Sequence, residues 1–227
     1  MFKKETLNKV INKAKELKAH YMNINAEDIP MCISDGNKKI GHVLNVSLMP
    51  IMTCKNCGKC KYLCYDVKAC IQYKNVIDAR VRNTVLLEKN RDEYFRRIYN
   101  KCLRRRKNKY FRWHVAGDIV DFDYFARMVE LAKEMVEFVF WTYTKNYEVV
   151  NEYCDKYGKD SIPDNLHIMF SEWRGMEMVN PYHFPEFRVV FKDEEEPKGF
   201  YCPGNCDVCK EIKRGCLVGE TTYCREH

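Results

Sequence analysis

Short apolar segments of strand character alternate with longer amphipathic segments along most of this chain, and no other feature limits its fold as much. The strand-like segments are rich in β-branched and aromatic residues and cover residues 44–48, 110–115, 138–143, 166–170 and 187–191. The helix-like segments cover residues 1–20, 76–103 with a break near Asn90, 122–136 and 147–157. Parallel strands need long crossovers, usually helices. We therefore predict an α/β fold, a partial (β/α) barrel of about four to six parallel strands.

The composition excludes both a disordered chain and a membrane bundle. The chain has 227 residues, of which 46% are hydrophobic and 31% are charged. No segment approaches the roughly 18 apolar residues of a membrane-spanning helix. The amino-terminal residues also lack the apolar run of a signal peptide. We therefore expect a cytoplasmic protein with no membrane partner.

The cysteines are the main chemical signal, because disulfides are rare in a reducing cytosol and 13 cysteines need another explanation. The first group follows the strand-like segment 44–48 and has the spacing C-x2-C-x2-C-x3-C, formed by Cys54, Cys57, Cys60 and Cys64. This spacing is close to that of bacterial ferredoxins. It predicts a [4Fe-4S] cluster, with zinc as the alternative. Three ligands would leave one iron open to a substrate or cofactor, whereas four would close the site.

A second group of cysteines lies near the carboxyl terminus and contains Cys202, Cys206, Cys209, Cys216 and Cys224. It has enough thiols for a complete tetrahedral site, so we predict a structural zinc knuckle there, with a second iron–sulfur cluster as the alternative. The expected division is residues 1–40 as an amino-terminal helix and connection, 41–192 as the partial barrel, and 193–227 as the Cys-rich metal-binding knuckle.

Polar residues follow several of the predicted strands. The loops at the carboxyl ends of parallel strands converge, and such ends carry the chemistry of α/β folds. His114, Gly117 and Asp118 follow the second strand, Lys145 follows the third and Glu172 follows the fourth. We predict catalytic roles for His114, Asp118, Lys145 and Glu172. Each also has a structural interpretation: a core histidine, a helix N-cap or a solvated side chain.

A basic run follows the helix-like segment 76–103 and suggests a contact with phosphate groups. The residues that would bind a nucleic acid are Arg96, Arg97, Arg104, Arg105, Arg106, Lys107 and Lys109. A solvated helix end is the alternative, since cations are favoured near a helix carboxyl terminus.

Two stretches carry a resemblance to known proteins: residues 53–65 with 75–83 behind them, and residues 112–118 followed by 140–145. From about residue 43 onward the chain resembles the phage and mobile-element family called gene product 88. More distantly, it resembles phage proteins related to spore photoproduct lyase, of the radical S-adenosylmethionine superfamily. The distant resemblance implies that Cys54, Cys60 and Cys64 hold a [4Fe-4S] cluster. It also implies that Gly117 and Asp118 bind S-adenosylmethionine. The superfamily's C-x3-C-x2-C spacing occurs here at Cys202, Cys206 and Cys209 instead.

Three hypotheses of function follow. The first is an iron–sulfur enzyme of radical S-adenosylmethionine type, used by a phage or mobile element and acting on nucleic acid. The second is a zinc-stabilised binding protein without catalytic activity that acts on a host protein or nucleic acid. The third is an electron carrier with a closed cluster. Metal content distinguishes the second hypothesis from the other two.

Overall fold

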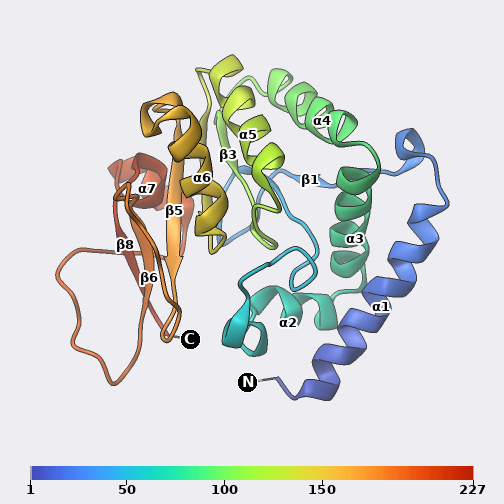
Figure 1. Cartoon of the computed structure of the whole chain (residues 1–227), viewed down its shortest axis with the longest axis horizontal. Coiled ribbons are helices and arrows are strands. Elements are labelled where there is room, and N and C mark those ends of the chain that lie inside the picture. The colour runs from blue at the N-terminus through green and yellow to red at the C-terminus, as the bar shows by residue number, and fades with distance from the viewer. Residues whose placement is uncertain (1, 227) are drawn as a thin grey trace.

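The computed structural model describes residues 2–226 and shows a mixed α/β protein in which helices cover the strands (Figure 1). The helices are α1 (Lys4–Met22), α2 (Tyr65–Gln72), α3 (Lys74–Lys89), α4 (Arg91–Leu103), α5 (Phe122–Glu134), α6 (Tyr147–Tyr157) and α7 (Cys206–Ile212). The strands are β1 (Ile33–Ser34), β2 (Leu44–Val46), β3 (Tyr110–Arg112), β4 (Val139–Thr144), β5 (Leu166–Glu172), β6 (Glu186–Val190), β7 (Phe200–Tyr201) and β8 (Thr222–Arg225).

The eight strands of the described residues form one sheet with the order β1-β2-β3-β4-β5-β6-β8-β7. Only β1 is antiparallel to its neighbour, and all other pairs are parallel. From β2 to β6 the strands follow one another in chain order, so the sheet does not reverse direction as a doubly wound sheet does. The predicted α/β class with parallel strands is confirmed.

Every strand and helix predicted from periodicity is present, with small differences at the ends. The break expected near Asn90 separates α3 from α4, because the Asn90 side chain accepts a hydrogen bond from the backbone N–H of Glu93 at 2.9 Å and caps the new helix. The amino-terminal helix α1 packs against α3 and buries Leu7, Val10 and Ala14. Within the described residues, no helix combines the length and apolar character needed to span a bilayer.

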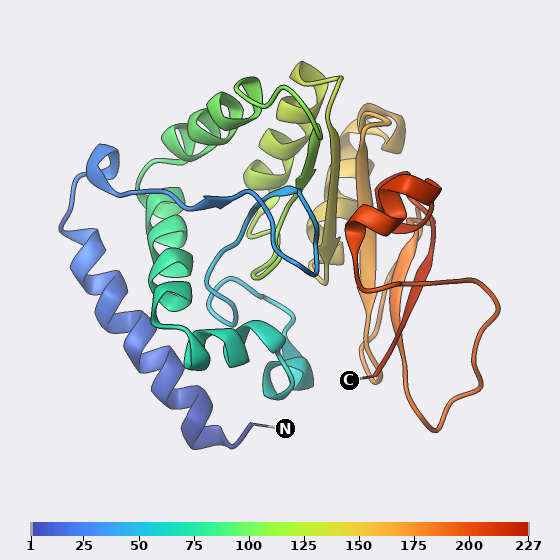
Figure 2. The same ribbon diagram turned by 180° about the vertical axis from the view of Figure 1, so that it is seen from behind.

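The two faces of the sheet have different coverings. Phe111, Phe140 and Ile168 belong to the main core under the helices, and α3, α4, α5 and α6 form an arc outside the strands (Figure 1). Trp141 and Met169 point to the other face, where they pack with Cys209, Cys216 and Leu217. Figure 2 shows α7 lying over the strands on this second face.

The carboxyl-terminal segment is therefore integrated with the sheet. Residues 193–227, expected as an appended knuckle, contribute β7 and β8, and β8 pairs with β6 in parallel register from Phe187↔Thr222 to Val190↔Arg225. We call the sheet face that carries Trp141 and Met169 the inner face. The residues between β7 and β8, which form α7 and the 3-10 helix Gly215–Val218, cover this inner face. The segment thus both extends the sheet and closes part of its core.

Candidate thiol site at the carboxyl ends of the strands

The first cysteine group lies on the connection that follows β2. We call residues 54–64 the cysteine loop; its second half forms the 3-10 helix Gly58–Tyr62, and α2 begins directly after Cys64. The loop and α2 lie at the edge toward which β5 points (Figure 1). The prediction that these cysteines occupy a loop at the carboxyl end of a strand is confirmed.

Two contacts tie the cysteine loop to the connection between β4 and α6. The Asn56 side chain donates a hydrogen bond to the backbone carbonyl of Lys145 at 2.8 Å. The Lys55 ammonium pairs with the Glu148 carboxylate, also at 2.8 Å. The loop after β2 and the loop after β4 therefore meet, although 89 residues separate Asn56 from Lys145.

A glycine allows the loop after β3 to approach the same place. Gly117 has φ +86°, and a Cβ atom there would lie 2.7 Å from Leu48 Cβ and 2.9 Å from Thr53 Oγ1. Thr53 directly precedes Cys54 and donates from its hydroxyl to the Met49 carbonyl at 2.9 Å. Only glycine fits this close approach without strain, and the approach brings Asp118 next to the cysteine loop.

Asp118 is 5% exposed and joins the loops after β3 and β4. Its carboxylate accepts hydrogen bonds from the Thr144 hydroxyl at 2.6 Å, from the Lys145 backbone N–H at 2.9 Å and from the Ile119 backbone N–H at 2.7 Å. Burial raises the pKa of Asp118, and these hydrogen bonds act in the opposite direction. The predicted proximity of Asp118 to the cysteines is observed, and its present contacts are those of a residue that positions two loops.

The thiols of the cysteine loop lie within electrostatic reach of one another. The pKa of Cys54 is raised chiefly by burial and next by the Asp118 carboxylate. Two other thiols of the loop raise it further. Burial also raises the pKa of Cys60 to about 11, although the Lys145 ammonium lowers it. All cysteines in the described residues are free thiols. The loop therefore gathers reduced thiols beside one carboxylate and one cation.

This gathering does not amount to a formed coordination sphere. Among residues 2–226, no three or more His, Cys, Asp or Glu side chains are placed as a set of metal ligands. The donor chemistry still fits a soft metal or an iron–sulfur cluster, because free thiols of one short loop share one environment with a compensating cation.

The end of β5 supplies further polar groups. Lys145 Nζ donates to Ser171 Oγ at 2.7 Å, and the Tyr147 hydroxyl donates to the Ser171 carbonyl at 2.5 Å. Glu172 forms an ion pair with Arg188 of β6 at 3.3 Å, and burial raises the pKa of its carboxyl. Tyr147 was not among the residues predicted from the sequence, and its pKa is raised by burial and then by the nearby Asp118 and Glu172 carboxylates. Its position just after the third strand was the available signal.

His114 lies in the main core, between β4 and α5. It is 3% exposed, and its two ring nitrogens hydrogen-bond to Thr142 Oγ1 at 3.1 Å and to the Tyr124 hydroxyl of α5 at 2.9 Å. Burial lowers the pKa of His114 to about 3, so the ring is neutral. Of the two interpretations of His114, this placement favours the core histidine over the catalytic one.

The second cysteine group lies on the inner face of the sheet. Cys209 and Cys216 are buried, and burial raises the pKa of Cys216 to about 11, although the nearby Tyr143 and Thr222 side chains lower it. Burial and the neighbouring thiols of Cys202, Cys206 and Cys216 raise the pKa of Cys209 to about 12.

The two cysteine groups approach each other around Lys145. The pKa of Cys224 is raised to about 11 by burial and by two thiols of its own group, whereas the Lys145 ammonium lowers it. The same ammonium lowers the pKa of Cys60 and Cys64 in the cysteine loop. Lys145 is thus a cation shared by both groups.

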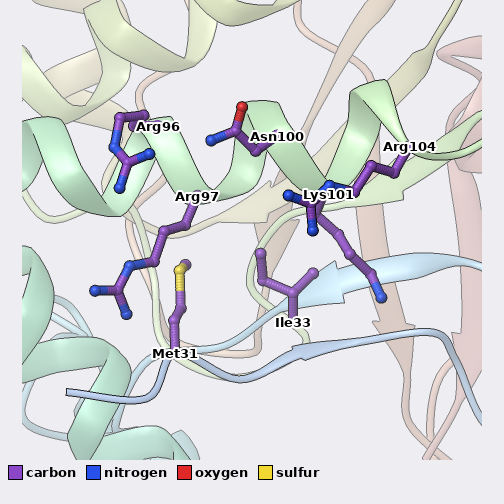
Figure 3. A pocket seen from close by; sticks show the side chains of 7 residues that line it. All are labelled: Met31, Ile33, Arg96, Arg97, Asn100, Lys101 and Arg104. Carbon is purple, nitrogen blue, oxygen red and sulfur yellow. The ribbon is translucent and has the colours of Figure 1, made fainter. Parts of the chain in front are cut away.

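The basic run lies at the other end of the strands. Arg104 to Lys109 connect α4 to the beginning of β3, whereas the cysteine loop lies at the carboxyl ends. Arg96, Arg97, Lys101 and Arg104 line a pocket of about 400 Å³ between α4 and residues 31–33 (Figure 3).

Most cations of the basic run already have partners. Arg96 and Arg97 pair with Glu93, both at 2.6 Å. Lys101 and Arg105 pair with Asp35 at 3.2 Å. In the described part of the chain, the members of the run without an ion pair are Arg104, Arg106 and Lys107. A contact with nucleic acid through this run would lie at a place separate from the thiol site.

Comparison with known proteins identifies one family. The family described as gene product 88 matches residues 6–215, which is most of the chain. Comparisons with curated proteins and with solved structures found no match. The sequence resemblance to gene product 88 is confirmed, and none of the comparisons supports the more distant resemblance to radical S-adenosylmethionine proteins.

Proposed function

The chain belongs to the gene product 88 family, and we propose that it is a metal–thiolate enzyme whose cysteine loop holds a [4Fe-4S] cluster for chemistry of the radical S-adenosylmethionine type. One observation carries this proposal. Free, closely spaced thiols lie on one loop that follows β2, beside Asp118 and Lys145, which follow the next two parallel strands. This is where α/β folds place their reactive groups.

The metal would compensate for the burial of the thiols. A buried thiol is harder to ionise, and only the thiolate binds metal. The pKa of Cys60 is about 11, so this thiol is protonated at neutral pH in the metal-free chain. Metal binding would release the proton, and Lys145 would offset the negative charge of the resulting thiolates.

We assign roles to this chain's own residues as follows. Cys54, Cys60 and Cys64 bind the cluster, and Cys57 is the fourth candidate ligand. Gly117 and Asp118 place the loop that binds the cofactor, and Lys145 and Glu172 face the substrate. When bound, a cluster with one open iron supplies a cofactor-binding position and a single electron.

The proposal includes a partial (β/α) barrel. Strands β2 to β6 follow in chain order, and the arc of helices lies on their outer side (Figure 1). This arrangement leaves an inner face that the cysteine loop adjoins at one end and α7 covers elsewhere. A sheet wound in this way presents its strand ends around one centre.

A zinc-stabilised binding protein is the second candidate. The observation that favours it is the packing of Cys209 and Cys216 into the inner core beside Trp141, because a metal held there would fasten α7 to the sheet. The closed electron carrier differs from the enzyme only in using all four thiols of the cysteine loop.

Metal analysis on protein purified without oxygen tests the proposal. We expect about four iron and four sulfide ions per chain, and an electron paramagnetic resonance signal of the reduced cluster that changes when S-adenosylmethionine is added. Cys60→Ser should lose this iron. Cys32→Ser, which alters a half-buried cysteine outside both groups, is the matched control and should keep it.

The other outcomes separate the alternatives. Colourless protein that contains only zinc supports the binding protein and contradicts the enzyme. A redox-active cluster that is indifferent to S-adenosylmethionine supports the closed carrier.

A further inference from the structure

Arg112 is a partly buried arginine without a counter-charge. It is the last residue of β3 and lies on the inner face, where its guanidinium stands 4.6 Å from the centre of the Tyr143 ring. Its Nε is buried and makes no hydrogen bond. In the part of the chain that the structure describes, no Asp or Glu side chain pairs with Arg112.

Other partly buried arginines of the chain are paired differently. Arg80 binds the Asp66 carboxylate through two nitrogens at 3.1 and 3.2 Å. Arg91 pairs with Asp121, and Arg97 with Glu93. This protein therefore compensates such guanidinium groups with its own carboxylates elsewhere, as desolvated charges require. Arg112 is an exception to that pattern.

The neighbours of Arg112 come from both cysteine groups. Tyr65, which directly follows Cys64, and the Cys206 and Cys216 thiols of the second group are all close enough to affect the pKa of Arg112. Phenol and thiol groups are ordinarily neutral at pH 7, so these neighbours leave the guanidinium charge uncompensated. Stacking on Tyr143 orients the guanidinium plane and leaves nitrogen donors for a ligand.

We propose that Arg112 is an anion-binding residue that holds the carboxylate or phosphate group of a small ligand between the two cysteine groups. A planar guanidinium binds either group through two parallel hydrogen bonds. Lys145 is a second cation near thiols of both groups, since its charge lowers the pKa of Cys60 and of Cys224. The inference names the substrate class of the proposed enzyme and rests on the proposed function for its catalytic meaning, whereas the binding itself needs no metal.

Calorimetric titration of the full-length chain tests this assignment. The probes are inorganic phosphate, adenosine 5′-monophosphate and acetate, each at constant ionic strength with chloride as the reference anion. We expect saturable binding of at least one probe. Arg112→Gln should weaken this binding tenfold or more, and Arg112→Lys less than Arg112→Gln. Phosphate or the nucleotide alone would identify a phosphate ligand, and acetate alone a carboxylate ligand.

Arg127→Gln is the matched control, because Arg127 is half-buried like Arg112 but lies on α5, outside both the thiol site and the basic run, and pairs with Asp92. It should leave binding unchanged. If no probe binds better than chloride, or if Arg112→Gln binds as well as the unaltered chain, the proposal is overturned. The first result would mean that other groups, such as the thiolates of a bound metal centre, already compensate Arg112, and the second that another cation binds the probe.

Two additional measurements keep the test decisive. Circular dichroism shows whether the Arg112 variants fold. If they do not fold, the unaltered chain is labelled with phenylglyoxal, which modifies arginine, and the modified residues are identified by peptide mass mapping. The bound probe should then slow modification of Arg112 but not of Arg127, and equal slowing of both would overturn the proposal. Iron is measured in the same samples of the unaltered chain. A chain that contains iron but binds no probe contradicts this inference alone, and a chain that binds a probe but contains no iron contradicts the proposed function alone.

Discussion

At the scale of single residues, two buried polar side chains of one short segment have different surroundings and different roles. His114 and Asp118 are both buried and lie four positions apart. His114 turns toward the helices and bonds to Tyr124, whereas Asp118 bonds to the connection after β4 and adjoins the cysteine loop. Backbone conformation contributes to this difference, since His114 and Gly117 both have positive φ. One residue thus stabilises the core, and the other organises the site.

His114 should make the protein less stable in acid. Its pKa is about 3 in the folded chain against 6.5 for a free side chain. The unfolded chain therefore binds more protons below pH 6.5, and the free energy of unfolding falls as the pH drops from 6.5 toward 3. Urea unfolding at several pH values should show a steeper loss for the unaltered chain than for His114→Gln. Equal slopes would contradict a neutral, buried His114.

Asp118→Asn should change the reactivity of a neighbouring thiol. The Asp118 carboxylate raises the pKa of Cys54, so its removal should lower that pKa and speed alkylation of Cys54 at a fixed pH. The rate of iodoacetamide labelling of metal-free protein, resolved by peptide mass mapping, measures this effect. Cys102 is the internal control, because its pKa is raised by burial and by Glu137 and should not respond. An unchanged rate at Cys54 would place Asp118 too far away to act on it.

At the scale of elements, the site is assembled from the loops after β2, β3, β4 and β5. The cysteine loop reaches the β4 connection through Asn56, and the β3 connection reaches the cysteine loop through Gly117. Lys145 joins the β4 connection to Ser171 of β5. These contacts make the loops a single unit, so a change in one loop should be felt in the others.

Gly117→Ala tests this assembly. The new Cβ would meet Leu48 at 2.7 Å and would also occupy a backbone conformation with φ +86°. Gly158→Ala is the matched control, because Gly158 also has a positive φ, +79°, but a Cβ atom there would have no other atom within 4 Å. The control therefore measures the cost of the backbone conformation without a steric clash. We expect Gly117→Ala to lower the free energy of unfolding by about 1–3 kcal/mol more than the control. Urea denaturation measures the free energy of unfolding of both variants. Equal decreases would show that Leu48 and Thr53 can move to accommodate the new methyl group.

At the scale of the whole molecule, the carboxyl-terminal segment acts as a cover for the inner face. Its strand β8 extends the sheet beyond β6, and its helices pack on Trp141 and Met169. This arrangement places Cys224 of the second group close enough to Lys145 for the ammonium to lower the pKa of the thiol. The cysteine loop and the carboxyl-terminal segment, which are far apart in the sequence, thus both have thiols near Lys145.

A pair of neighbouring residues measures how much this cover contributes. Leu217 is 6% exposed in the inner core, whereas Val218 in the same 3-10 helix is 43% exposed. Leu217→Ala should lower the free energy of unfolding by about 2–5 kcal/mol, and Val218→Ala should change it by less than about 0.5 kcal/mol. Comparable effects of the two substitutions in urea denaturation would show that the segment does not dock as described.

The approximate ends of the helices and strands could be predicted from the sequence, because the spacing of apolar residues can be read within about ten consecutive residues. The position of the cysteine loop followed in the same way, since a strand ending at Val46 leaves Cys54 on the next connection. The roles of individual polar residues did not follow. His114 and Asp118 both come after the same strand, and only the packing of α5 and of the β4 connection separates them.

The sequence by itself determined an α/β chain of parallel strands, its membership of a family and the clustering of its thiols, because these depend on local periodicity and on residue spacing. Only the tertiary structure decided that the last segment joins the sheet, that the basic run lies away from the thiols and that Arg112 lacks a carboxylate partner. Those features depend on contacts between residues far apart in the chain, which no local pattern encodes.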